Sequence, residues 1–304
     1  MRAMAQTEPA PTTDPSWSFL WLEITGRCQL SCTHCYAESG PTGLHSALSR
    51  REWQTVITDA SKAGIRMVQF NGGEPTTHPD FADLVAHAIA NGLAVEVYTN
   101  LVRVNLSWWE LFSCPQVSLA TSYYSDQSSQ HDIITRRKGS HARTRSNIME
   151  AVRRGIPLRV GLVDLDDAQR VDQARAELRS MGVQNIGTDR LRQVGRGSTS
   201  TEKDTTQLCG NCARGVAAVS GDGDVWPCVF ARWMPVGNVR DTPLADILNG
   251  PVMAATSSRL AECFGRGCPC VPKMCDPQCG PSCSPACRPA NNCIPVGTCV
   301  PSYE

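Results

Sequence analysis

The chain has 304 residues with 29 basic and 29 acidic side chains, so its net charge is zero. This length fits one large domain or a domain with an appendage, and the balanced charge gives no electrostatic reason to expect nucleic acid or a membrane surface as a partner. No apolar run is long enough to cross a bilayer, and residues 1–16 lack the apolar core of a signal peptide. We therefore expect a cytoplasmic protein with a disordered segment at 1–16.

Strands and helices alternate from residue 17 to residue 197. The apolar runs predict six strands, at residues 19–25, 66–71, 93–98, 116–121, 158–163 and 183–187. Capping boxes at Ser49–Glu52 and Ser107–Glu110 each predict a helix start, and residues 122–141 predict a polar loop. Six such units imply a parallel sheet with right-handed crossovers, either an open partial barrel or a doubly wound sheet.

Unusual residues follow the carboxyl ends of the predicted strands. A cysteine-containing loop follows the first strand, Gly72–Pro75 follows the second, Thr99 and Asn100 end the third, and Ser122 follows the fourth. Barrels and open α/β sheets place their chemistry at this edge. The sequence therefore predicts one site formed by these segments.

The loop after the first strand carries Cys28, Cys32 and Cys35 at C-x3-C-x2-C spacing, followed by Tyr36. Three thiolates this close can hold one face of a [4Fe–4S] cluster, and such a cluster normally takes four ligands. One iron would then stay open for a substrate or cofactor. Part of a zinc site, or disulfide partners, are the alternatives that the spacing alone leaves open.

The sixteen cysteines are unevenly distributed. Three lie in this loop, one is Cys114, and the other twelve follow from Cys209 onward. Residues 198–208 are polar and predict a linker, and residues 209–304 form a cysteine-rich extension that includes seven Cys-x-Pro units. Proline at this frequency excludes a helix, so the extension is expected to wind around metal or sulfide, or to end in a disordered thiol-rich tail.

At this point the sequence resembles the radical S-adenosylmethionine (SAM) enzymes. Cys28-x3-Cys32-x2-Cys35-Tyr36 and Gly72-Gly73-Glu74-Pro75, one unit later, carry the resemblance over residues 17–197. It implies a partial (β/α)6 TIM-like barrel. It also implies that the three cysteines are catalytic cluster ligands and that SAM chelates the fourth iron. The residues implied to contact SAM are Tyr36, Gly72, Gly73, Glu74, Pro75, Thr99, Asn100 and Ser122.

The extension resembles a SPASM domain, the auxiliary-cluster module of the same superfamily, at Cys212, Gly223 and Cys228. Its later cysteines depart from the family pattern C-x2-C-x5-C-x3-C. The resemblance implies one or two auxiliary [4Fe–4S] clusters. The implied ligands are Cys209, Cys212, Cys228, Cys268, Cys270, Cys275, Cys279 and Cys283.

Residues 131–140 also resemble a segment of the SPASM peptide-modifying enzymes. Thr135 stands where that segment normally carries an arginine, and Arg136 or Arg137 could substitute. A solvated basic loop is the alternative. Tyr123 and Tyr124, just before this segment, either line a substrate pocket or pack in the core.

Together these resemblances imply an oxidoreductase that cleaves SAM to a 5′-deoxyadenosyl radical and modifies a ribosomally synthesised precursor peptide, most simply by an intramolecular crosslink. Peptide epimerisation and oxidation of a Ser or Cys side chain are rival reactions. A non-catalytic Fe–S electron carrier is the alternative from another class. The implied partners are the precursor peptide, a reductase such as flavodoxin or ferredoxin, and a separate leader-binding protein if the peptide has a leader.

Overall fold

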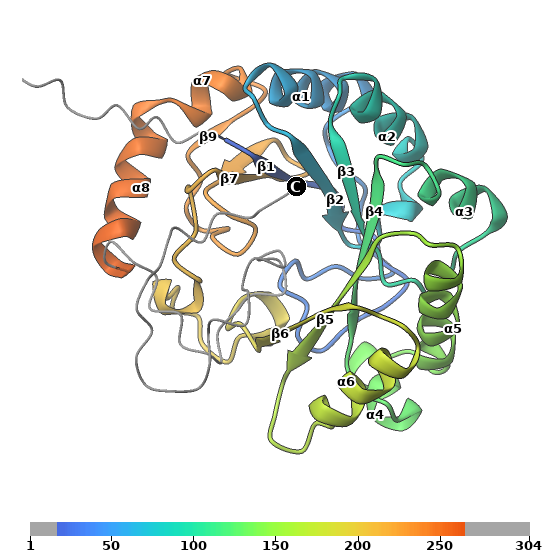
Figure 1. Ribbon diagram of the computed structural model, residues 1–304. Coiled ribbons are helices and arrows are strands. Elements are labelled where there is room, and N and C mark those ends of the chain that lie inside the picture. The colour runs from blue at the N-terminus through green and yellow to red at the C-terminus, as the bar shows by residue number, and fades with distance from the viewer. Residues whose placement is uncertain (1–16, 265–304) are drawn as a thin grey trace, which may run out of the picture.

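The computed structural model describes residues 17–264 (Figure 1). In this part of the chain one curved sheet has the strand order β6-β5-β4-β3-β2-β1-β7-β8-β9. Its strands are β1 (Phe19–Thr25), β2 (Met67–Gly72), β3 (Ala94–Tyr98), β4 (Val117–Tyr123), β5 (Leu158–Asp164), β6 (Asn185–Arg190), β7 (Val216–Val219), β8 (Asp224–Trp226) and β9 (Gly237–Asn238). All six predicted strands of the barrel are present, each within three residues of its predicted ends.

Strands β1 to β6 are parallel and adjacent in chain order, as the alternating pattern predicts. Helices α1, α2, α3 and α5 lie along the outside of the curve in Figure 1. The helices are α1 (Arg50–Lys62), α2 (Phe81–Ala90), α3 (Leu106–Phe112), α4 (Ser128–Thr135), α5 (Ser140–Arg153), α6 (Val171–Ser180), α7 (Leu244–Leu248) and α8 (Pro251–Phe264). The predicted partial (β/α)6 barrel is confirmed.

Strand β1 separates two apolar cores because its side chains alternate between the two faces of the sheet. Leu20 and Leu22 contribute to the large core beneath the outer helices. Phe19 and Trp21 point to the opposite face, where they pack with Trp226 and other residues from the C-terminal third of the described chain. The central strand is therefore buried on both sides, as its nearly continuous apolar sequence indicates.

Strand β7 adds to the free edge of β1 in parallel, with Trp21 opposite Ala218. Strands β8 and β9 then continue the sheet in antiparallel fashion. Within the described residues, the predicted barrel and the first part of the predicted extension thus share one sheet. No helix within residues 17–264 is both long and apolar enough to cross a membrane.

The capping box at the start of α1 is confirmed. The Ser49 hydroxyl accepts from the backbone N–H of Glu52, and the Glu52 carboxylate accepts from the backbone N–H of Ser49 at 2.7 Å. The second predicted box is wrong. Helix α3 begins earlier because Asn105, itself a strong N-cap residue, accepts from the backbone N–H of Trp108 at 2.9 Å, and Ser107 donates to Asn105.

The prediction of a polar loop over 122–141 is also wrong, because this segment contains α4. The helix is short and mostly polar, but it buries His131, Ile134 and Thr135. From within α4 the Asp132 carboxylate accepts from the backbone N–H of His141 at 2.9 Å, and so stabilises the first turn of α5. Such a helix is stabilised by long-range packing, which periodicity within eight residues does not reveal.

Candidate active site

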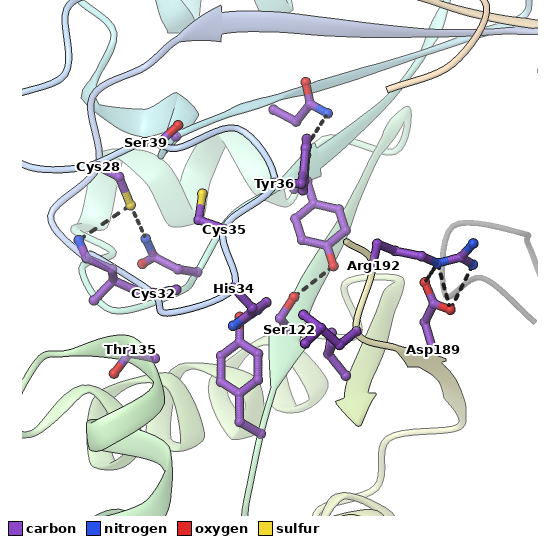
Figure 2. Close-up of a pocket in the computed structure, with 18 of the residues that line it drawn as sticks. Cys28, Cys32, His34, Cys35, Tyr36, Ser39, Ser122, Thr135, Asp189 and Arg192 are labelled. Carbon is purple, nitrogen blue, oxygen red and sulfur yellow. Dashed lines mark hydrogen bonds and ion pairs between the residues drawn. The ribbon is translucent and has the colours of Figure 1, made fainter. Parts of the chain in front are cut away.

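A pocket opens at the carboxyl ends of strands β1 to β6, the edge that the sequence predicts (Figure 2). Its open space, including the mouth, is about 1090 Å³, at the upper end of the range of small-molecule sites. The lining residues are Cys28, Leu30, Cys32, His34, Cys35, Tyr36, Ser39, Asn71, Gly72, Gly73, Tyr98, Asn100, Ser122, Tyr124, His131, Thr135, Thr144, Val163, Asp189, Arg190, Leu191, Arg192 and Phe230.

All three predicted cysteines of the first loop line this pocket. Cys28 is buried, and its sulfur accepts from the backbone N–H of Leu30 at 3.4 Å and from the Asn100 side-chain amide at 3.6 Å. Cys32 and Cys35 are half-buried. No three His, Cys, Asp or Glu side chains in residues 17–264 are grouped tightly enough for a single metal ion.

Burial makes the Cys28 and Cys32 thiols weak acids. Desolvation, reinforced by the charge of Glu74, raises the pKa of Cys28 far above its ordinary value. Desolvation also raises the pKa of Cys32 to about 12, while the nearby Arg196 guanidinium acts in the opposite direction. Because a metal ligand is a thiolate, the loop needs a bound cationic centre before all of its sulfurs ionise.

The glycine turn after β2 fits tightly against the start of the cysteine loop. Gly72 has a φ of 109°, and a Cβ added there would lie 2.3 Å from the carbonyl oxygen of Thr25. A Cβ on Gly73 would lie 2.2 Å from the carbonyl oxygen of Arg27. The two glycines line the pocket, but the close approach that requires them is to the chain's own backbone.

Glu74 lies behind the pocket wall and is 1% exposed. Its carboxylate accepts from the Thr99 hydroxyl at 2.8 Å, the Asn100 N–H at 2.9 Å and the Thr76 hydroxyl at 2.7 Å. Burial raises the pKa of Glu74, and these hydrogen bonds oppose that effect. Of the predicted SAM contacts, Glu74, Pro75 and Thr99 are therefore outside the lining, where Glu74 orients Asn100.

The other predicted contacts lie in the wall. The Tyr36 hydroxyl accepts from the Asn71 side-chain amide at 3.3 Å. The Ser122 hydroxyl lies 2.9 Å from the Tyr98 hydroxyl. Tyr98 belongs to none of the sequence motifs. Figure 2 shows Ser122 between the cysteine loop and the ion pair Asp189–Arg192. This ion pair, with 2.8 Å between Arg192 Nη2 and Asp189 Oδ1, joins the end of β6 to the segment that follows it.

The structure separates the two tyrosines that follow Ser122. Tyr123 is fully buried in the core, where its hydroxyl donates to Glu177 at 2.8 Å. Tyr124 lines the pocket beside His34, with ring centroids 4.9 Å apart. Thr135 also lines the pocket, whereas Arg137 lies outside and donates to the Gln29 carbonyl at 3.1 Å.

Three buried polar atoms of the wall have no hydrogen-bond partner within residues 17–264. They are the Asn71 Oδ1 and the Nδ1 atoms of His34 and His131. Burial lowers the pKa of His34 to about 4 and that of His131 to about 3, so both imidazoles are neutral at physiological pH. Buried polar groups normally have partners, and these atoms fit a pocket that takes a polar ligand.

Two of the described cysteines of the extension, Cys212 and Cys228, belong to the second apolar core, whereas Cys263 is exposed. Cys212 and Cys228 are buried with their sulfurs 2.8 Å apart, longer than a disulfide bond of about 2.05 Å. Cys209 is half-buried. The other predicted auxiliary ligands, Cys268, Cys270, Cys275, Cys279 and Cys283, lie outside the described residues, as does the Cys-x-Pro repeat.

Sequence comparison decides the family. The model of the Radical SAM superfamily matches residues 22–176. The chain belongs to this superfamily. A second match, to the iron–sulfur cluster-binding SPASM domain, covers residues 209–287. The chain is therefore a radical SAM protein with a SPASM domain, which implies a [4Fe–4S] cluster, SAM and auxiliary Fe–S clusters.

Similar proteins include a PqqA peptide cyclase from Ruegeria pomeroyi, 31% identical over 188 residues, or 58% of this chain and 47% of the relative. The subtilosin biosynthesis protein AlbA from Bacillus subtilis is 24% identical, covering 81% of this chain and 64% of AlbA. The chain thus matches about half the length of the first relative.

Among solved structures, SuiB from Streptococcus suis, bound to its precursor peptide SuiA, superposes with a TM-score of 0.66 at 14% identity, covering 80% of this chain and 67% of SuiB. An anSMEcpe structure with bound AdoMet and a peptide gives a TM-score of 0.62 at 13% identity, covering 79% of this chain and 81% of that one. At these identities the likeness establishes the shared fold.

The residues present fit the groups that the family implies. Three thiols from one loop, the adjoining glycine turn and the unpartnered polar atoms share a pocket of suitable size. Arg196, Tyr98 and Phe230, which also shape the site, lie in no motif, and their role depends on the folded structure.

Proposed function

We propose that this radical SAM protein cleaves SAM reductively and uses the resulting radical to modify a ribosomally synthesised peptide. The observation that carries the proposal is the convergence of Cys28, Cys32 and Cys35 with the Gly72–Gly73 turn on one pocket. In this proposal the three cysteines ligate the [4Fe–4S] cluster. Gly72, Gly73, Asn100, Ser122 and Tyr36 line the space for SAM.

When bound, the reduced cluster would supply one electron that splits SAM into methionine and a 5′-deoxyadenosyl radical, which abstracts hydrogen from the substrate. The chain's own residues would orient and shelter this chemistry. Glu74, with Thr99 and Pro75, supports the wall from behind and holds Asn100 against Cys28. Tyr98, Tyr124 and Phe230 surround the pocket with rings that exclude water.

The names of similar proteins support a peptide substrate. One is a PqqA peptide cyclase, another acts in subtilosin biosynthesis, and a third was crystallised with a precursor peptide. We propose an intramolecular crosslink as the product, with epimerisation or oxidation of a Ser or Cys side chain as rivals. The auxiliary clusters, held by Cys209, Cys212, Cys228 and cysteines beyond residue 264, would accept the electron left on the peptide.

The proposal includes further partners and a compartment. A flavodoxin or ferredoxin would deliver the electron for SAM cleavage, and a separate protein would present a leader if the substrate has one. We place the reaction in the cytoplasm, where thiols stay reduced.

SAM cleavage is the first test. The protein is reconstituted anaerobically with iron and sulfide, reduced with dithionite and supplied with SAM, and 5′-deoxyadenosine is measured by mass spectrometry. We expect the native protein to form 5′-deoxyadenosine and the Cys32→Ala variant to form none. The Cys114→Ala variant is the control, because Cys114 lies far from the cysteine loop in sequence, and we expect it to form 5′-deoxyadenosine as well. A reconstituted native protein that makes none would favour the electron-carrier alternative.

Coexpression with a small peptide encoded beside the gene tests the product. A crosslink removes two hydrogens, so the peptide mass falls by about 2 Da, whereas epimerisation leaves the mass unchanged. Digestion to free amino acids and chiral analysis then identify an epimerised residue. A mass gain, or an unchanged mass whatever the chiral analysis shows, would contradict peptide crosslinking.

A further inference from the structure

The chain that leaves the edge strand β6 returns to the cysteine loop and binds its backbone. The Arg196 N–H donates to the carbonyl of Cys35 at 3.0 Å. The Arg196 guanidinium donates through Nε to the carbonyl of Cys32 at 2.9 Å and through Nη2 to the carbonyl of Ser39 at 2.7 Å. One residue thereby holds three carbonyls of the loop that carries the cysteines.

Glycines on both sides of Arg196 allow this close contact. Gly195 has a φ of 59°, and a Cβ there would lie 2.4 Å from the carbonyl oxygen of Tyr36. A Cβ on Gly197 would lie 2.8 Å from the Leu191 side chain and 3.3 Å from the carbonyl oxygen of His34. The Gly195–Gly197 turn is therefore shaped to fit against the cysteine loop.

The positive charge of Arg196 is directed at this loop. Arg196 is half-buried, and within residues 17–264 it forms no ion pair with an acidic side chain. Its hydrogen bonds go to neutral carbonyls, which do not cancel its charge. A half-buried charge acts more strongly on its neighbours than one in water, because the local dielectric constant is lower.

We propose that Arg196 is a positioning residue of the cysteine loop and that its charge raises the reduction potential of the cluster bound there. This inference rests on the proposed function, since it assumes a cluster on Cys28, Cys32 and Cys35. One electron from a reductant lowers the net charge of the cluster by one. A nearby cation stabilises the more negative form, and charge and hydrogen bonding around a cluster set its potential.

Three variants separate charge from geometry. Arg196→Met removes both, Arg196→Gln removes the charge but keeps an amide donor, and Arg196→Lys keeps the charge but loses the planar fork. Arg240→Met is the matched control, because Arg240 also donates to a backbone carbonyl, that of Ala47 at 2.6 Å, away from the cysteine loop. Cys28, Cys32 and Cys35 are unchanged in every variant.

The variants are reconstituted as full-length holoproteins, and the readouts are iron content, the EPR spectrum with and without SAM, and a dithionite titration of the midpoint potential. We expect a more negative midpoint in Arg196→Met and Arg196→Gln, and a midpoint near that of the native protein in Arg196→Lys and Arg240→Met. We also expect the change that SAM makes in the EPR spectrum to be altered in Arg196→Lys, because a single ammonium cannot reproduce the fork to Cys32 and Ser39.

Native potential and native spectra in both neutral variants would overturn the inference. If the neutral variants bind little iron but melt like the native apoprotein, the positioning role is supported, whereas iron loss together with a lowered melting temperature would show a general folding role and overturn it. A native protein that binds no cluster at all would instead contradict the proposed function.

Discussion

The Glu74 carboxylate accepts a 2.9 Å hydrogen bond from the backbone N–H of Asn100 and so joins the turn after β2 to the end of β3. The Asn100 side chain continues the connection, because its Oδ1 accepts from Gln29 at 2.9 Å and its Nδ2 reaches the Cys28 sulfur at 3.6 Å. A carboxylate behind the wall is thus linked to the first cysteine through one intermediate residue.

Glu74→Gln should weaken this connection. The glutamine NH2 would replace a carboxylate oxygen that accepts from N–H and O–H donors, leaving a buried donor without a partner. We expect a loss of about 1–3 kcal/mol in the free energy of unfolding. Urea denaturation of the apoprotein measures it, with the exposed Glu110→Gln of α3 as control. Equal stability of the two variants would argue against the buried network.

Gly72→Ala should be more damaging than the same change at Gly64. Both glycines have positive φ, 109° and 84°, but only Gly72 has a backbone oxygen within 2.3 Å of the added Cβ, while Gly64 faces open space. Gly64→Ala should cost about 1–2 kcal/mol from the left-handed conformation alone. We expect Gly72→Ala to cause a larger loss in the free energy of unfolding than Gly64→Ala, and also to reduce the amount of iron that the protein binds. A smaller loss at Gly72 than at Gly64 in thermal melts would contradict the steric argument.

Arg232→Met should destabilise the contact between β1 and the C-terminal third of the described chain. Arg232 forms an ion pair of 2.6 Å with Glu23, whose side chain is 6% exposed, and its guanidinium lies 4.4 Å from the Trp226 ring centroid. Removing the cation leaves a buried carboxylate, at a cost of about 3–5 kcal/mol.

The double variant Glu23→Gln/Arg232→Met provides the control for this pair. Without the buried charge it should recover part of the stability that Arg232→Met loses, as measured by denaturant unfolding in a double-mutant cycle. A double variant as unstable as the sum of the two single variants would show that the two side chains act independently.

Asp132 should make stability depend on acid pH. Burial alone would raise the pKa of Asp132, but hydrogen bonds from the backbone of His141 and Gly139 and from the Ser140 hydroxyl outweigh it and hold the pKa below its usual value. A depressed pKa favours the ionised form in the folded state. The contribution of Asp132 to the free energy of unfolding is therefore complete above the unfolded-state pKa of about 3.9. It is lost as the pH falls through the folded-state pKa.

Asp132→Asn tests this dependence. The amide loses the charge at the start of α5, and we expect a loss of about 1 kcal/mol at neutral pH. At pH values below the depressed folded-state pKa, the native protein and the variant should converge, because the native carboxyl is then protonated as well. Apoprotein melting temperatures across this range give the comparison. A difference that stays constant down to the lowest pH would contradict the assignment to Asp132.

The sequence alone determined the order and type of the barrel elements. Strand and helix periodicities are local, so β1 to β6 and the Ser49 cap were predictable from a few neighbouring residues. The same holds for the first site residues, because Cys28, Cys32, Cys35 and the Gly72–Pro75 turn lie directly after strands whose carboxyl ends must meet at one edge of a parallel sheet. Two local predictions failed, at Ser107 and over 122–141, where an alternative cap and long-range packing prevailed.

Only the tertiary structure decided which distant groups share that edge. The pairing of β7 with β1, the position of Glu74 behind the wall and the separation of Tyr123 from Tyr124 depend on contacts between elements far apart in the chain. Arg196 is the clearest case, since it lies 161 to 168 residues after the three cysteines and belongs to no motif. A hydrogen bond to a loop carbonyl requires a donor and a direction, and the intervening fold sets both.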